Sequence, residues 1–169
     1  MISKVCSSYD CAMRTETCEK CKISNETFLK YITVSVSADC MKNLEDIVRD
    51  QFQPKLLRKK CTHCGERILE TVTGFTHLIM DMVDVTNKNA LLTTTLQHIP
   101  ERIVIDSSGS IYSLRGIIDY HGSGEGIGHF TALCLRNNTS WQKYDDLKLK
   151  VQDVKPTKAV NIQAMIYTL

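Results

Sequence analysis

The chain has 169 residues, 43% of them hydrophobic, and a formal net charge of +2 at pH 7. This length and composition predict one globular domain with a modest core and argue against a disordered chain. The small net charge gives no electrostatic footprint for nucleic acid or for an anionic membrane surface, so we expect neither as a partner. No stretch reaches the roughly 20 apolar residues that a membrane-spanning helix needs.

Eight cysteines are the most unusual feature of the composition. The first residues contain no apolar core of a secretory signal, so we expect an intracellular protein, cytoplasmic or nuclear, with reduced thiols. Cys18 and Cys21 form one C-x-x-C pair, and Cys61 and Cys64 form a second. Two such pairs can surround one zinc ion with four thiolates, which is the interpretation that we favour over buried or incidental cysteines.

Residues near the second pair refine this expectation. His63 could replace a thiolate, but it lies inside the pair, and we expect it to point away from the ion. Gly65 follows at a position that often needs a positive φ. The cysteines without a C-x-x-C partner are expected to be small core residues or surface thiols, and they are Cys6, Cys11, Cys40 and Cys134.

Between the two cysteine pairs, the sequence predicts a strand followed by a helix. Residues 28–36 (FLKYITVSV) alternate in polarity and are rich in β-branched side chains, which is typical of a strand. Residues 42–52 (KNLEDIVRDQF) carry apolar side chains at helical spacing, and Pro54 follows just beyond. The basic run at residues 55–60 (KLLRKK) is expected to form a solvated face.

After the second cysteine pair, the pattern changes to short strands separated by polar turns. Such a series predicts a mainly antiparallel sheet. The expected strands cover residues 76–85, 101–106, 111–122, 129–136, 140–146 and 161–169.

Two of these strands bring a histidine and an aspartate together. If the turn between them centres on Asn137, His129 faces Asp145 across the hairpin. A carboxylate beside an imidazole fixes its tautomer and favours the imidazolium, which is the work of the orienting acid in a nucleophilic triad. On these residues alone, a pair of surface polar groups is the simpler interpretation, and both stay open.

Five short motifs of the second half occur in the order found in one enzyme family. They are YSL at residues 112–114, YHG at 120–122, GHF at 128–130, WQKYDD at 141–146 and the closing MIYTL at 165–169. Together with the two cysteine pairs and the strand and helix between them, they resemble the C-terminal half of the ubiquitin-specific proteases, which are papain-like cysteine peptidases. The resemblance covers residues from about Thr17 to Leu169.

The resemblance implies an α+β fold, the C-terminal part of a papain-like deubiquitinase. A zinc-ribbon "fingers" region would occupy about residues 15–75, and an antiparallel "palm" about residues 76–169. The implied reaction is hydrolysis of the isopeptide or peptide bond after the C-terminal glycine of ubiquitin. Ubiquitin or a ubiquitinated protein is the implied partner, and structural zinc the implied cofactor.

The motifs also carry implied residue roles. His129 matches the catalytic base, Asp145 the acid that orients it, and Asp146 a second acid that assists near the oxyanion. The residues matched to the groove for the ubiquitin tail are His121, Gly122, Gly128 and Phe130. The implied zinc ligands are Cys18, Cys21, Cys61 and Cys64.

The chain departs from the family pattern where the nucleophile is concerned. The family's cysteine lies in an N-terminal box of the type G-N-T-C-Y-M-N-S, and neither Cys6 nor Cys11 has that context. The usual L-K-R-F strand end is MVDV here, and GHY has become GHF. Because a thiolate must attack the carbonyl, we expect residues 1–169 to be inactive alone.

Three functions remain open. The first is a segment of an active deubiquitinase whose cysteine box is encoded elsewhere, for instance in a separate N-terminal half, or is lost from an incomplete gene model. The second is a catalytically dead ubiquitin-binding or scaffold module. The third is a structural zinc-ribbon domain unrelated to ubiquitin.

Overall fold

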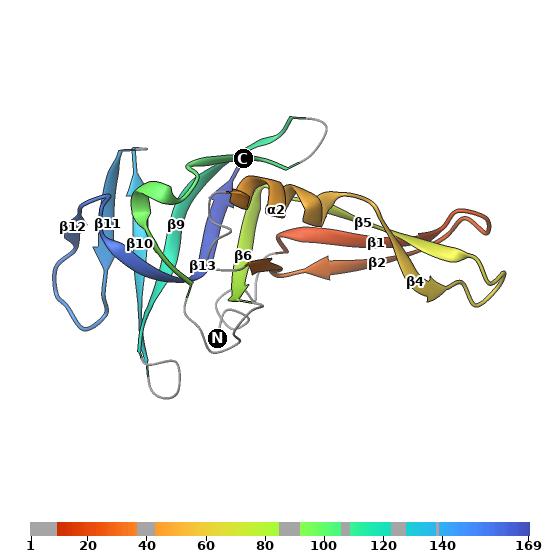
Figure 1. Cartoon of the computed structure of the whole chain (residues 1–169), viewed down its shortest axis with the longest axis horizontal. Helices are drawn as coiled ribbons and strands as arrows, with labels where there is room; N and C mark the ends of the chain where they lie inside the picture. Colours follow the sequence, from red (N-terminus) through yellow and green to blue (C-terminus); the bar gives the residue numbers. More distant parts are fainter. Residues whose placement is uncertain (1–9, 37–42, 85–91, 106–108, 123–127, 138) are drawn as a thin grey trace.

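Two β-sheets share one core in the computed structural model of the chain, which describes residues 10–36, 43–84, 92–105, 109–122, 128–137 and 139–169. A narrow sheet extends away from a broad one (Figure 1). All strand pairs in both sheets are antiparallel except the pairing of β3 with β6. The expected mainly antiparallel α+β fold with little helix is therefore confirmed.

The narrow sheet, called the arm below, has the strand order β2-β1-β5-β4. Its strands are β1 (Ala12–Cys18), β2 (Ile23–Leu29), β4 (Lys55–Lys60) and β5 (Arg67–Gly74). The two C-x-x-C turns connect β1 to β2 and β4 to β5, so they meet at the free end of the arm (Figure 1). As expected, the basic run that forms β4 is mostly exposed.

The broad sheet, called the main sheet below, follows the order β12-β11-β10-β9-β13-β6-β3, with β7 paired to β13 and β8 to β9. Its strands are β3 (Ile32–Val36), β6 (His77–Asp84), β7 (Leu92–Thr95), β8 (Arg102–Val104), β9 (Ile111–His121), β10 (His129–Arg136), β11 (Ser140–Tyr144), β12 (Gln152–Val154) and β13 (Ala159–Thr168). A short 3₁₀ helix, η2 (Leu96–His98), follows β7. The two strands nearest the middle, β9 and β13, pair with each other and carry much of the core.

Helix α2 (Leu44–Phe52) confirms the expected amphipathic segment. Leu44, Val48 and Phe52 recur every four residues and are buried, which gives the helix one apolar stripe. Arg49 on the outer side pairs with two acidic residues of the first turn. The chain becomes extended at Gln53, as the following proline favours.

The strand expected over residues 28–36 is wrong as a single element. It breaks at Lys30 and Tyr31 into β2, which belongs to the arm, and β3, which belongs to the main sheet. Alternation continues through the break, so periodicity alone does not reveal that the chain changes sheet there. β2 is almost entirely exposed, whereas Ile32 and Val34 of β3 are buried.

No helix in the described parts of the chain is long and apolar enough to cross a membrane.

Candidate active site and candidate metal centre

His129 and Asp145 lie at neighbouring strand ends in contact with each other. His129 opens β10, Asp145 follows the last residue of β11, and the imidazole Nε2 lies 2.8 Å from the carboxylate Oδ1. Only 7% of the Asp145 side chain is exposed, against 32% for His129. The expected pairing of these side chains is thus present in the geometry.

The register of the hairpin differs from the expected one by one residue. Leu135 lies opposite Trp141 and Arg136 opposite Ser140, so the turn centres one position after Asn137. Pairing stops before Asp145, and the side chain reaches His129 from the turn rather than from a ladder position.

A tight turn fixes the Asp145 carboxylate. Its Oδ1 also accepts a hydrogen bond from the backbone N–H of Leu147 at 3.1 Å, and its backbone carbonyl accepts one from Lys148. The side-chain nitrogen of Lys143 lies 3.6 Å from Oδ2. The hydrogen bond from His129, with lesser contributions from the Leu147 amide and from nearby positive charge, lowers the pKa of Asp145, so this carboxylate is ionised at neutral pH.

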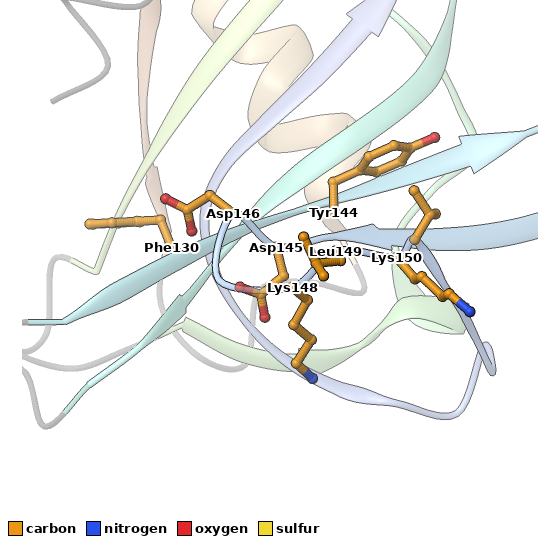
Figure 2. Close-up of a pocket in the computed structure, with 8 residues that line it drawn as sticks. Phe130, Tyr144, Asp145, Asp146, Lys148, Leu149 and Lys150 are labelled. Atoms are coloured by element: carbon orange, nitrogen blue, oxygen red, sulfur yellow. The ribbon is translucent and has the colours of Figure 1, made fainter.

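Asp146 has a different environment. Its Oδ1 is 3.7 Å from Nε2 of His129, beyond hydrogen-bond distance, and 84% of its side chain is exposed. Figure 2 shows the carboxylates of Asp145 and Asp146 turned in different directions. Asp145 is therefore the acid that holds the imidazole.

A hollow of about 420 Å³ opens beside these acids (Figure 2). It is lined by Phe130, Tyr144, Asp145, Asp146 and residues 148–151. It is open to solvent along the turn, where Leu149 is fully exposed.

The residues expected to line the tail groove lie around the end of the β9–β10 hairpin. His121 is opposite His129 in the register, with ring centroids 6.4 Å apart and planes at 24°. A Cβ at Gly122 or Gly128 would collide with the ring of Tyr120, which explains why both positions need glycine. Phe130 packs against the same Tyr120 ring at 4.9 Å.

The four paired cysteines converge at the free end of the arm. The sulfurs of Cys18 and Cys64 are 3.5 Å apart, those of Cys21 and Cys61 are 3.9 Å apart, and all four lie within 4.8 Å of one another. A tetrahedron with Zn–S bonds of about 2.3 Å has sulfurs about 3.8 Å apart, so this donor set fits zinc.

Both cysteine turns use the same backbone shape. The residue after the second cysteine donates its N–H to the carbonyl of the first, Lys22 to Cys18 at 2.7 Å and Gly65 to Cys61 at 2.9 Å. Both donors have positive φ, 58° for Lys22 and 74° for Gly65. The expected positive φ after the second pair is confirmed, and His63 is not among the four converging residues.

The thiols of this cluster titrate unequally. Backbone N–H groups, first that of His63, lower the pKa of Cys61 to about 6. A hydrogen bond with the Cys64 side chain, followed by desolvation and by the other two sulfurs, raises the pKa of Cys21 to about 12. Four negative sulfurs repel one another, and a divalent cation would relieve this repulsion.

The other cysteines are not arranged as nucleophiles in the described parts of the chain. Cys11 is completely buried in the core. Cys134 lies on β10, but strand alternation places it on the face opposite His129, and burial raises its pKa. Cys6 and Cys40 lie outside the described residues.

Comparison with known families decides the membership. Residues 11–168 match the family model described as ubiquitin carboxyl-terminal hydrolase. The chain belongs to this family. The resemblance to ubiquitin-specific proteases inferred from the motifs is confirmed.

Several solved structures share the fold. The yeast SAGA DUB module with a mutant of Sgf73 matches with a TM-score of 0.60 and 14% identity over 94% of this chain. A SAGA DUB module bound to monoubiquitin gives 0.58 and 15% over 95%. The Pan2 catalytic unit of Neurospora crassa, with protease and nuclease domains, gives 0.61 and 12% over 95%.

The chain spans only part of each of these relatives. It covers 40% of the first two solved chains and 33% of the third. It is also 34% identical over 119 residues to the 120.7 kDa protein in the NOF-FB transposable element of Drosophila melanogaster, covering 65% of this chain and 11% of that protein.

Several residues that shape the site were missed from the sequence. The Leu147 amide and Lys143 act on Asp145 through a turn that no motif specifies. Asp119 and Thr131, buried near His121, were also missed. A charged residue within the otherwise apolar run at residues 116–120 (GIIDY) of β9 was the available signal for Asp119.

Proposed function

We propose that this chain is the part of a deubiquitinating enzyme that carries the catalytic base, and that it acts on the bond after the C-terminal glycine of ubiquitin. The observation that carries the proposal is the 2.8 Å contact between His129 and the largely buried carboxylate of Asp145. Family membership supports it, as does the fold shared with a module bound to monoubiquitin.

In this proposal His129 moves the proton of each step. Nε2 donates to Asp145, which leaves Nδ1 to take the proton of an attacking thiol. The thiolate adds to the glycine carbonyl, and the leaving amine departs with that proton as the thioester forms. Water then attacks the thioester and gives a proton to His129, which returns it to the thiol as the carboxylate of ubiquitin is released. Asp145 keeps the ring oriented, and Asp146 assists near the oxyanion.

The thiol itself is proposed to come from another polypeptide segment. Cys11 is buried, Cys134 faces away from His129, and the four paired cysteines are gathered at the free end of the arm. We therefore propose that residues 1–169 alone do not hydrolyse ubiquitin conjugates. A separate N-terminal half is the proposed source of the nucleophile.

The other residues matched to the family are proposed to have the roles that the match implies. His121, Gly122, Gly128 and Phe130 are proposed to line the groove for the ubiquitin tail. Cys18, Cys21, Cys61 and Cys64 are proposed to hold one structural zinc ion in a fingers region of about residues 15–75, and residues of about 76–169 form the palm. The proposed location is intracellular, cytoplasmic or nuclear.

A second candidate is a catalytically dead module that binds ubiquitin. The same cysteine positions favour it, because none of the described thiols can reach Nδ1 of His129. One experiment separates the two functions. Residues 1–169 are mixed with a ubiquitin probe that has an electrophilic C-terminus, with and without a separately made N-terminal half that carries the cysteine box of a relative.

We expect no adduct from residues 1–169 alone and an adduct on the added half in the mixture. His129→Ala should abolish that labelling, because the thiol loses its base, whereas the matched variant His98→Ala should not. An adduct on the isolated chain would contradict the missing nucleophile. Binding of ubiquitin without restored labelling would favour the dead module.

A further inference from the structure

A fully buried carboxylate lies beneath the candidate active site. Asp119 on β9 is 0% exposed. Its Oδ2 accepts a hydrogen bond from the side chain of Lys158 at 2.7 Å, and its Oδ1 accepts one from the backbone N–H of Asn161 at 2.9 Å. Lys158 belongs to the turn before β13, so Asp119 links β9 to the start of β13, and both of its carboxylate oxygens have hydrogen-bond donors.

This carboxylate also holds a histidine. Nε2 of His121 lies 3.1 Å from Oδ2 of Asp119 and 3.2 Å from the hydroxyl of Thr131, which is itself 2% exposed. The carboxylate can only accept a hydrogen bond from Nε2, whereas the Thr131 hydroxyl can accept or donate one, so this arrangement favours the His121 tautomer with the hydrogen on Nε2. Asp119 and Thr131 contact the ring of His121 at Nε2 from its buried side, and 39% of the side chain is exposed.

The ring of His121 lies beside the ring of His129. The two residues are opposite each other in the β9–β10 register, with centroids 6.4 Å apart and planes at 24°. Each ring turns its Nε2 to an aspartate, His121 to Asp119 and His129 to Asp145. The site thus contains two nearly parallel imidazole–carboxylate pairs on one face of the sheet.

We propose that Asp119 and His121 are positioning residues that hold the imidazole of His129 in the plane in which it meets Asp145. His121 supplies a rigid wall along one face of the His129 ring, and Asp119 supplies the rigidity of that wall. The inference rests on the proposed function for the role of His129, but it concerns the ring itself and is tested without turnover.

The experiment observes the two rings in the full chain of residues 1–169, labelled with ¹⁵N-histidine. Long-range ¹H–¹⁵N correlation spectra report the tautomer of each ring, and the ring N–H signal of His129 reports its bond to Asp145. We expect the Nε2–H tautomer for both rings in the unaltered chain. A mixture of tautomers for His121 in the unaltered chain would overturn the proposal.

Removing the ring of His121 should make the ring of His129 more mobile without unfolding the chain. In His121→Ala, we expect the ring N–H of His129 to exchange several-fold faster, because the ring can leave its hydrogen bond to Asp145 more often once its neighbour is removed. His121→Phe restores a flat ring at this position and should restore slow exchange. An unchanged His129 signal in His121→Ala, or failure of the phenylalanine to restore it, would overturn the proposal.

Removing the carboxylate of Asp119 should affect His129 indirectly, through His121. In Asp119→Asn, the His121 ring should populate both tautomers and the His129 signal should weaken. Because Lys158 loses its ion-pair partner in that variant, the double variant Asp119→Asn/Lys158→Gln removes both charges. The control Asp81→Asn alters another carboxylate of the main sheet, bonded to Gln163, and should leave both rings unchanged.

A purely structural role gives a different result. It predicts that the Asp119 variants lower the melting temperature as the control does, with both ring signals intact, and that outcome would overturn the proposal. Loss of probe labelling in the mixture with an N-terminal half tests the proposed function and leaves these ring signals unaffected, so the two failures are distinguishable.

Discussion

Lys22 and Gly65 occupy equivalent positions in the two cysteine turns, but only one of them suits its backbone. Both have a positive φ and donate back to the first cysteine of the pair. Glycine adopts this conformation without steric cost, whereas a side chain with a Cβ is strained there. The second turn is therefore relaxed, and the first carries strain.

This difference predicts that Lys22→Gly stabilises the chain. Relief of the strained φ should outweigh the entropy that glycine adds to the unfolded chain, for a net gain of about 0.5–1 kcal/mol in the free energy of unfolding. Gly65→Ala should lower the free energy of unfolding. Urea denaturation of the zinc-loaded protein measures both, and a loss of stability in Lys22→Gly would show that the lysine side chain has another role.

Asp145 makes stability depend on pH in a predictable direction. Its pKa is lowered in the folded chain, first by the hydrogen bond from His129, so its contribution is fully present above the unfolded value of about 3.9. The contribution is lost as the pH falls below that value through the folded pKa. Asp145→Asn should therefore lower the free energy of unfolding at pH 7. Near pH 3, the free energies of unfolding of the variant and of the unaltered chain should differ less.

The matched control for this experiment is Asp146→Asn. Asp146 is the next residue, but it is largely exposed and lies beyond hydrogen-bond distance of His129. Urea unfolding at pH 7, 5 and 3 should show little effect of this change. An equal loss in the two variants would mean that the hydrogen bond to His129 does not stabilise the fold.

At the scale of elements, the strands of the main sheet could be predicted because most are long and apolar. β9, β10 and β13 fall within one or two residues of expectation, and α2 shows its buried stripe in the sequence. The strands β1, β4 and β5 could not be predicted, since most of their residues are half-buried or exposed, so alternation carries little information there.

Only part of the candidate site could likewise be predicted from the sequence. Motifs place His129, Asp145 and the four cysteines, because those residues keep fixed spacing within single turns or strands. Contacts between β9 and the turn before β13 depend on the tertiary fold, so the partners of Asp119 could not be foreseen from the sequence. The break at Tyr31 was missed for a similar reason, because only packing decides which sheet each half joins.

The arm is expected to depend on the proposed zinc ion. Its four strands form a thin sheet whose free end is gathered by the four thiols. We expect one zinc ion per chain by elemental analysis, a sharp fall in Cys61→Ser, and unchanged content in Cys134→Ser. After chelation, hydrogen exchange should accelerate in β1, β2, β4 and β5 but not in β9 and β10, and an arm that stays protected without metal would contradict this role.

At the scale of the whole molecule, one helix connects the two sheets. α2 contacts β5 of the arm as well as β3 and β8 of the main sheet, and the shared core continues from Cys11 and Ala12 into the main sheet. The arm and the main sheet are therefore mechanically coupled at the base of the arm. Movement of the arm's base should be transmitted to β3 through this helix.

Truncating a fully buried residue of this helix should weaken both sheets together. Leu44 is completely buried, so Leu44→Ala should lower the free energy of unfolding by about 2–4 kcal/mol. Asp46→Ala, on the exposed side of α2, should change it by less than about 0.5 kcal/mol. Hydrogen exchange should show faster opening in β3 and in β5, and an effect confined to one sheet would contradict the coupling.

The position of β13 also imposes an order on synthesis. This strand lies between β9 and β6, near the middle of the main sheet, although it follows every other strand in the chain. A ribosome delivers the residues of the arm first, and those strands can pair with one another while translation continues. The main sheet has a gap at its middle until residue 168 has left the ribosome, so β6 and β9 must wait with unpaired edges for the last strand to enter between them.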